Sequence, residues 1–281
     1  MGGEYDKIEN GEAKISEWLR GRFLKERLLF TEMAELMLES FKPLIGRQRD
    51  TDESKLALLT LATRMFNDAE GAKRLLLWGL PDQAQPVIRD IIECMLLFRL
   101  FLQKPKTAKK WLTDLAEYQP GDVNAKLLEF GVNAGEYAWY GLLSHESHSN
   151  LLASLSHVQE TDVGEQGMLR RFYFGSARTT ETEYFIQQSF LTLFFLLHLA
   201  LLEPLAELYD RYSESDVFKI WYGKVANLLP KLEDLTSEVT VKRTTDTPQA
   251  KDIPQKLIMK KLRFEEFKKR VTRDGDLPPK N

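Results

Sequence analysis

The chain has 281 residues with 39 basic and 42 acidic side chains, a net charge of −3. This length allows one large domain to bury its own core, and the charge balance lacks the basic excess typical of nucleic-acid-binding proteins. The single cysteine, Cys94, excludes an internal disulfide and a cysteine-based zinc site. Because the N-terminal residues contain no apolar signal core, we expect a cytoplasmic protein.

Hydrophobic periodicity predicts two long helices in the first third of the chain. The first runs from about Glu12 to Leu44, and the second ends at Trp78. Gly79 suits the left-handed position that follows a helix, and Pro81 cannot continue one. This connection is short, so we expect the second helix and its successor to be antiparallel neighbours.

The next predicted helix, from about Gln83 to Leu102, is apolar nearly all round in its second half. A helix without a polar face is typical of the centre of a bundle. Asp82 is expected to cap this helix, and Pro86 is expected at or near its first turn. Cys94 lies in the apolar stretch and is expected to be a buried, unreactive thiol.

Three further helices are expected before the chain changes character. Two are short and amphipathic, at about Lys104–Glu117 and Asp122–Phe130, with a turn at Pro120 between them. The third, at about Glu136–His157, contains three of the four histidines. From Val158 to Arg178 the helical period is lost, and we expect a small hairpin or a lid there.

The most apolar segment of the second half belongs to a predicted helix from about Thr180 to Tyr212. Its apolar run is too short for a membrane span, which needs about 20 residues, so we expect a core or dimer helix and no membrane span. Homodimerisation is expected if the apolar face of Phe190–Leu202 is not covered within the chain. A further helix is expected at about Ser215–Leu235.

These elements predict an all-α fold of about eight mostly antiparallel helices. We expect a helical bundle domain at residues 1–236, with its core at 53–212, and a C-terminal arm at 237–281. The arm carries 12 basic and 7 acidic residues, a net charge of +5, which leaves 27 basic and 35 acidic residues, or −8, for the rest. Its predicted amphipathic helix, Lys256–Val271, either binds phosphate backbones or an acidic protein surface, or packs on the bundle.

Sequence motifs for nucleotide and metal chemistry are missing. The chain contains no glycine-rich phosphate loop and no GxSxG nucleophile elbow. His145, Glu146 and His148 have HExH spacing, whereas the zinc-protease motif is HExxH, so a hydrogen-bonded histidine pair is favoured over a metal site. The sequence therefore predicts neither a cofactor nor a metal.

Two sets of polar residues recur at four-residue spacing. Glu136, Tyr140, Ser144 and His148 follow one stripe of a predicted helix, which indicates a shared environment. Arg89 and Glu93 are likewise four apart on the central apolar helix.

These apolar surroundings predict that Glu93 is substantially buried and needs a partner. We expect Arg89 to be the partner within its helix and the helix of His148 to supply another.

The stretch GLPDQAQPVIRDIIECMLLFRLFL, followed later by YGLLSHESH, resembles domain-of-unknown-function family 5677 of bacteria and archaea. That family has an RxxxE helix and then a helix with a Tyr, a Leu-Ser and a His four residues after the Ser. The resemblance spans about residues 60 to 205. Such families are similar to the HEPN helical domains, many of which are metal-independent ribonucleases or partners of nucleotidyltransferases in defence and toxin–antitoxin systems. The matching residues are Arg89, Glu93, Tyr140, Ser144 and His148.

The resemblance implies an RNA-directed nuclease or a nucleic-acid-associated component of a prokaryotic defence system. In that hypothesis, His148 is the general base on a ribose 2′-hydroxyl, and Arg89 stabilises the phosphate charge. Active HEPN domains carry an Arg shortly before the His on one helix, and no histidine of this chain has such an arginine. The alternative is a non-catalytic protein-interaction or ligand-sensing module, in which these residues form a polar network that fixes the register of two core helices.

Overall fold

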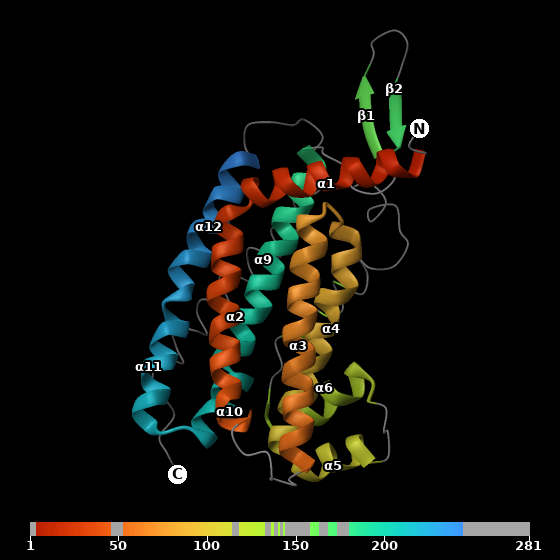
Figure 1. Cartoon of the computed structure of the whole chain (residues 1–281). Coiled ribbons are helices and arrows are strands. Elements are labelled where there is room, and N and C mark those ends of the chain that lie inside the picture. The colour runs from red at the N-terminus through yellow and green to blue at the C-terminus, as the bar shows by residue number, and fades with distance from the viewer. Residues whose placement is uncertain are drawn as a thin grey trace. The chain divides into compact units, whose positions relative to one another are not determined.

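The computed structural model describes residues 4–45, 53–113, 118–132, 136–137, 140, 143, 158–162, 168–172 and 180–243. These residues form an all-α bundle and one β-hairpin (Figure 1). The elements are α1 (Glu4–Arg22), α2 (Leu24–Ile45), α3 (Glu53–Leu77), α4 (Pro81–Gln103), α5 (Pro105–Thr113), α6 (Pro120–Glu129), β1 (Val158–Asp162), β2 (Met168–Phe172), α9 (Thr180–Leu202), α10 (Pro204–Tyr212), α11 (Ser215–Ala226) and α12 (Leu228–Arg243).

The chain divides into two compact units, Met1–Thr236 and Ser237–Asn281. The first unit contains the helices from α1 to α11, most of α12 and the hairpin. Of the second unit, the structure describes the residues as far as Arg243, where α12 ends. The predicted amphipathic helix Lys256–Val271 lies outside the described residues.

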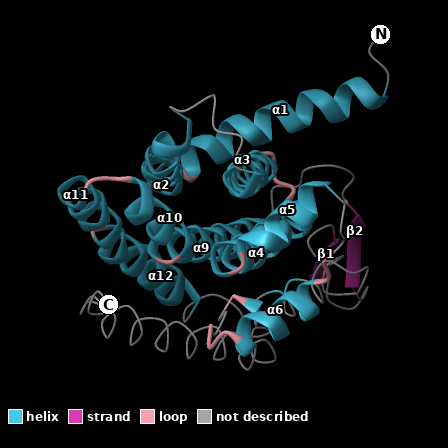
Figure 2. Cartoon of the chain, turned by 90° about the horizontal axis from the view of Figure 1, so that it is seen from below, coloured by secondary structure: helices cyan, strands magenta, loops and turns pink. Residues whose placement is uncertain are grey.

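Helix α4 is the central helix of the bundle, as its composition predicts. It packs against α3, α5, α6, α9 and α10. The end view shows α4 and α9 in the middle, with α2 and α3 on one side and α6 and α12 on the other (Figure 2). The core of α4 consists of fully buried apolar side chains, among them Ile88, Ile91, Ile92, Met95, Leu96, Phe98 and Leu100.

Helices α3 and α4 are antiparallel neighbours joined by a tight turn at Gly79. This glycine has φ of 77°, the left-handed conformation that glycine adopts without strain. The Leu80 amide donates to the Leu75 carbonyl at 2.9 Å, and the Gly79 amide donates to the Leu76 carbonyl at 3.0 Å. This pair of hydrogen bonds is the Schellman motif, and it closes the last turn of α3.

Two predicted helix starts are wrong. Helix α4 begins at Pro81, after Leu80, so Asp82 lies in the first turn and is not the cap. Pro86 consequently lies inside the helix, where its ring nitrogen donates no backbone hydrogen bond. Pro120 starts α6 and does not form a turn, because a proline at the first helical position replaces an amide that has no partner within the helix.

Three breaks divide segments that were predicted as continuous helices. They fall at Phe23, Glu203 and Asn227, so the described residues contain more helices than the predicted eight. Pro204 follows the second break and starts α10, because a proline restricts the residue before it to non-helical conformations.

Helix α9 is buried within the bundle. Among the described residues, the stretch Glu183–Arg211 is long and apolar enough to cross a membrane, and 83% of its most apolar window is buried inside the protein. No residue of Phe190–Leu202 is exposed. This face is therefore covered within the chain, and the reason for expecting a dimer through α9 is removed. The expectation that this apolar run is too short for a membrane span is wrong, and the predicted absence of a span stays a prediction.

The segment that lacks helical periodicity contains a hairpin, one of its two predicted forms. Strands β1 and β2 pair in antiparallel orientation, with Val158 opposite Phe172 and Asp162 opposite Met168. The strands form a two-stranded sheet. The insertion therefore leaves the fold class all-α.

Candidate functional site

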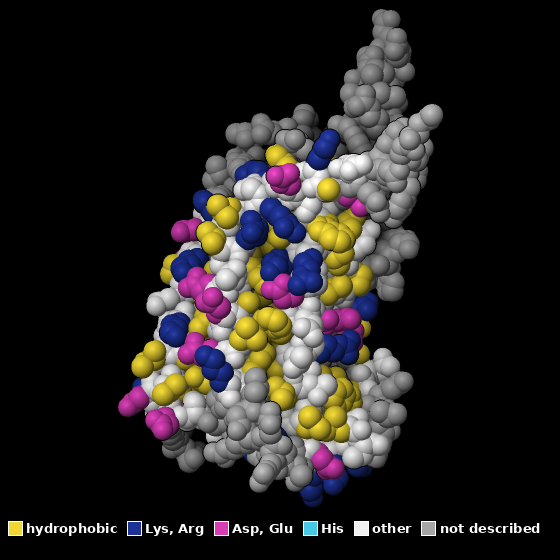
Figure 3. All heavy atoms as spheres, viewed as in Figure 1, with side chains coloured by type: hydrophobic (Ala, Val, Ile, Leu, Met, Phe, Trp, Pro, Cys, Tyr) yellow, Lys and Arg dark blue, Asp and Glu magenta, His cyan; other side chains and the backbone are white. Residues whose placement is uncertain are grey.

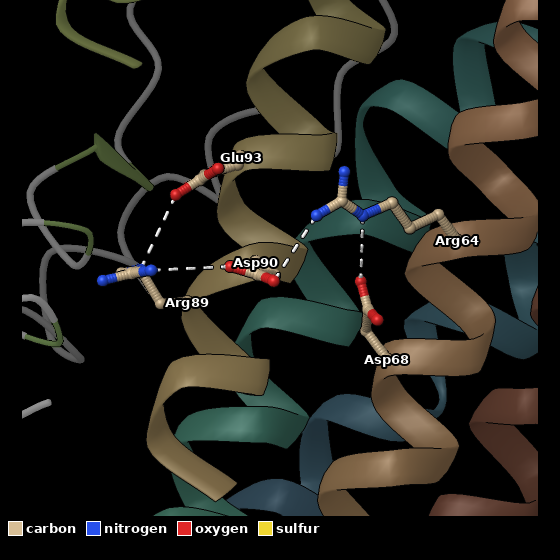
Figure 4. A network of polar contacts seen from close by, with 5 residues as sticks. All are labelled: Arg64, Asp68, Arg89, Asp90 and Glu93. Atoms are coloured by element: carbon tan, nitrogen blue, oxygen red, sulfur yellow. Dashed lines mark hydrogen bonds and ion pairs between the residues drawn. The ribbon is translucent and has the colours of Figure 1, made fainter. Parts of the chain in front are cut away.

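Five charged residues on neighbouring faces of α3 and α4 form the most extended polar network among the described residues. We call them the α3–α4 cluster: Arg64, Asp68, Arg89, Asp90 and Glu93 (Figure 4). Arg64 and Asp68 lie one helical turn apart on α3, and Arg89 and Glu93 lie one turn apart on α4. The cluster therefore joins the two helices that the turn at Gly79 makes antiparallel.

Each arginine of the cluster faces two carboxylates. Nη2 of Arg64 lies 3.4 Å from Oδ2 of Asp90, and Nε of Arg64 lies 3.7 Å from Oδ2 of Asp68. Nη2 of Arg89 lies 3.7 Å from Oδ1 of Asp90, and Nε of Arg89 lies 3.6 Å from Oε1 of Glu93. Asp90 is thus shared by both arginines and links α3 to α4.

The cluster is half-buried, so the expectation that Glu93 is substantially buried is met in part. The Glu93 side chain is 30% exposed, because it lies on the flank of α4 and not on the stripe that faces the core. Burial and the nearby Asp90 carboxylate raise the pKa of Glu93, and Arg89, Arg64 and Tyr140 oppose that rise. Burial also raises the pKa of Asp68, and Arg64 opposes it. Both shifts indicate carboxylates crowded into a partly desolvated region.

Tyr140 joins the cluster from outside the two helices. Its ring centre lies 5.9 Å from Cζ of Arg89, and its hydroxyl favours the charged form of Glu93 and so lowers the pKa of that carboxyl. The Tyr137 ring stacks on the Tyr140 ring, with centres 6.0 Å apart and an interplanar angle of 8°. The structure therefore brings three of the five predicted site residues together. The other two, Ser144 and His148, lie outside the described residues.

Glu136, the first residue of the predicted polar stripe, belongs to a different network. It is fully buried, and its Oε1 accepts a hydrogen bond of 2.5 Å from Nε of Arg99. Arg99 also pairs with Glu203, at the break between α9 and α10. The side chains of Glu136 and Tyr140 therefore contact different parts of α4. Glu136 pairs with Arg99, and Tyr140 contacts Arg89, which lies ten residues and about 15 Å away along the helix.

Sequence reasoning missed Arg99 and Glu203. The available signal was a lone cation in the most apolar part of the central helix, because a buried charge needs partners. Burial lowers the pKa of Arg99, but the Glu136 and Glu203 carboxylates outweigh burial and raise it. Arg99 therefore stays charged, and this triad fixes Glu136 and the α9–α10 junction against α4.

Cys94 and His198 are both structural in the described part of the chain. Burial raises the pKa of the Cys94 thiol to about 12, and Cys94 is a free cysteine. The prediction that this thiol is buried is confirmed, and its low reactivity stays a prediction. Nε2 of His198 lies 3.1 Å from the Val225 carbonyl oxygen, and burial lowers the pKa of His198 to about 4. A neutral imidazole with its proton on Nε2 donates that hydrogen bond and joins α9 to α11.

Among the described residues, no three His, Cys, Asp or Glu side chains are arranged to hold a metal ion. A scan against protein-family models, a search of curated proteins and a search of solved structures each found no match. The resemblance to family 5677 and to the HEPN domains therefore stays a prediction.

Proposed function

We propose that this chain is a non-catalytic, protein-interaction helical module in which the α3–α4 cluster is a structural ion-pair network. The observation that carries the proposal is the pairing of both arginines with carboxylates of the chain itself. Arg64 and Arg89 share Asp90, and Asp68 and Glu93 supply the second partners.

The charge balance of the cluster supports a structural role. Phosphodiester binding requires cationic groups that can turn toward the ligand phosphate. In the cluster, three carboxylates surround two guanidinium groups, so a phosphate would have to displace Asp90 or Glu93 from Arg89 and would meet their repulsion. The same arrangement suits two helices that are held in register by charges of opposite sign.

A second candidate function is an RNA-directed nuclease of a prokaryotic defence system. The observation that favours it is the contact of Arg89 and Glu93 with Tyr140 in a partly exposed place, because all three residues belong to the motifs that resemble family 5677. In this candidate, Arg89 stabilises the developing phosphate charge and His148 is the general base. If the chain has this function, we expect it in the cytoplasm with RNA as its partner.

One experiment separates the two candidates by measuring RNA cleavage and thermal stability on the same variants. The variants are Arg89→Ala and His148→Ala, with Arg74→Ala as the matched control. Arg74 is an exposed arginine of α3, and its Nε lies 3.8 Å from Oε2 of Glu70.

We expect no cleavage of a randomised single-stranded RNA by any form of the protein. We also expect a larger drop in melting temperature for Arg89→Ala than for Arg74→Ala. Cleavage by the unmodified chain that Arg89→Ala and His148→Ala both abolish, at unchanged melting temperature, would overturn the proposal in favour of the nuclease.

A further inference from the structure

The outer face of α11 exposes two large apolar side chains. Val217 is 43% exposed, and Ile220 is 66% exposed, more than any other large apolar side chain that the structure describes. The opposite face of α11 is buried through Trp221 and Val225. Helix α11 lies at the left border of the bundle in Figure 1, and apolar, acidic and basic side chains lie together along that border in Figure 3.

The residues of this outer face are symmetric about Ile220. Val217 and Gly223 lie three residues before and after it. Asp216 and Lys224 lie four residues before and after it. All five are exposed. Because positions three and four apart share one face of a helix, these residues form a single strip. A half-turn about an axis through Ile220 therefore exchanges the acidic end of the strip, Asp216, with its basic end, Lys224.

We propose that a second copy of this chain docks on this strip, with the two α11 helices antiparallel and the two-fold axis at Ile220. In this arrangement, Ile220 contacts Ile220 of the second copy. Asp216 of each copy faces Lys224 of the other, so the pair forms twice. A parallel pairing would place Asp216 against Asp216 and Lys224 against Lys224. Charge complementarity therefore selects the antiparallel, isologous pairing.

Gly223 makes the close approach of the two helices feasible. A Cβ atom at Gly223 would meet nothing within 4 Å, so the space above it is open. The half-turn places Val217 of one copy over Gly223 of the other, where the missing side chain leaves room for the valine. An exposed glycine inside a helix reduces helix stability, and close packing of a neighbour gives this one a role.

The existing ion pairs of the strip do not compete strongly with the dimer. Oδ1 of Asp216 lies 3.3 Å from Nζ of Lys219, and Nζ of Lys224 lies 3.2 Å from Oε2 of Glu39. Exposed pairs of this kind contribute little, and each side chain can be shared with a second partner. A contact built on one helix of 12 residues is small. We therefore expect a weak, concentration-dependent dimer, independent of the function proposed for the α3–α4 cluster.

Cross-linking tests the position of the two-fold axis. Ile220→Cys places a thiol on the axis, and the native Cys94 is buried. Leu28→Cys is the matched control, because Leu28 is 63% exposed on α2 and lies off the strip. With a short bis-maleimide reagent, we expect a covalent dimer from Ile220→Cys and at least about tenfold less from Leu28→Cys. Equal yields from the two variants would contradict the proposal.

Charge exchange tests the pairing itself by sedimentation velocity over a concentration series. Asp216→Lys and Lys224→Asp each place like charges opposite one another, so each should weaken the dimer about tenfold. The double variant Asp216→Lys/Lys224→Asp restores opposite charges and should return the dissociation constant to within about threefold of the unmodified value. A monomer at all concentrations, or a double variant weaker than both single variants, would overturn the proposal. Melting curves confirm that each variant folds.

Discussion

Arg99 on α4 donates a 2.5 Å hydrogen bond from Nε to Oε1 of the fully buried Glu136. This pair holds Glu136 against the central helix. We predict that Glu136→Ala lowers the free energy of unfolding by about 3 to 5 kcal/mol, because it leaves the buried Arg99 charge with Glu203 as its remaining carboxylate partner. Urea unfolding measures the change.

The control for Glu136→Ala is Glu183→Ala, which removes an exposed pair with Arg22. That substitution should cost less than about 1 kcal/mol. A loss of similar size for the two variants would show that the Arg99–Glu136 pair does not stabilise the bundle.

The buried imidazole of His198 predicts a specific pH dependence of stability. Burial lowers the pKa of His198 from 6.5 to about 4, so the unfolded chain binds a proton that the folded chain does not bind between these values. Stability from this group is present above pH 6.5 and is lost as the pH falls toward 4. Between pH 7 and 4.5, the loss should be about 2 to 3 kcal/mol.

His198→Gln is the matched variant for this prediction, because an amide nitrogen can still donate to the Val225 carbonyl and does not titrate. Chemical unfolding of both proteins at pH 7 and pH 4.5 gives the comparison. The variant should lose less stability than the unmodified chain over this range. Parallel pH profiles would contradict the assigned pKa of His198.

Two glycines should respond to alanine in opposite directions. Gly71 lies inside α3, and an added Cβ atom would lie 3.8 Å from Cγ1 of Val87, an ordinary van der Waals contact. Gly71→Ala should therefore stabilise the protein by about 0.5 to 1 kcal/mol. Gly131 ends α6 with φ of +73°, so Gly131→Ala should destabilise it by about 1 kcal/mol. Melting temperatures that shift in the same direction would contradict these backbone assignments.

The class and order of the helices were predictable because buried stripes repeat at helical spacing. The breaks at Phe23 and Asn227 were not, because the apolar spacing runs through them. The ring centres of Phe23 and Phe190 lie 5.7 Å apart, so a contact between residues far apart in the sequence fixes the turn at Phe23. At Glu203, the following Pro204 was a local signal, and the pairing of Glu203 with Arg99 was not.

The candidate site was predictable where it depends on spacing within one helix. Arg89 and Glu93 pair one turn apart, as their spacing indicates. Arg64 and Asp90 are 26 residues apart, and their contact depends on how α3 and α4 pack. Spacing within a helix says nothing about such a pair, so the sequence analysis indicated two of the five residues of the α3–α4 cluster, Arg89 and Glu93.

The most direct test of the structural role of the α3–α4 cluster is a double-mutant cycle on Arg64 and Asp90, which lie on different helices. Urea unfolding of Arg64→Ala, Asp90→Ala and the double variant measures the coupling between them. Lys231→Ala with Asp90→Ala is the control cycle, because Lys231 lies on α12 and pairs with Glu32. We predict a coupling of about 0.5 to 1 kcal/mol for Arg64 with Asp90 and additivity for the control. Additive losses in both cycles would contradict the claim that the cluster holds α3 against α4.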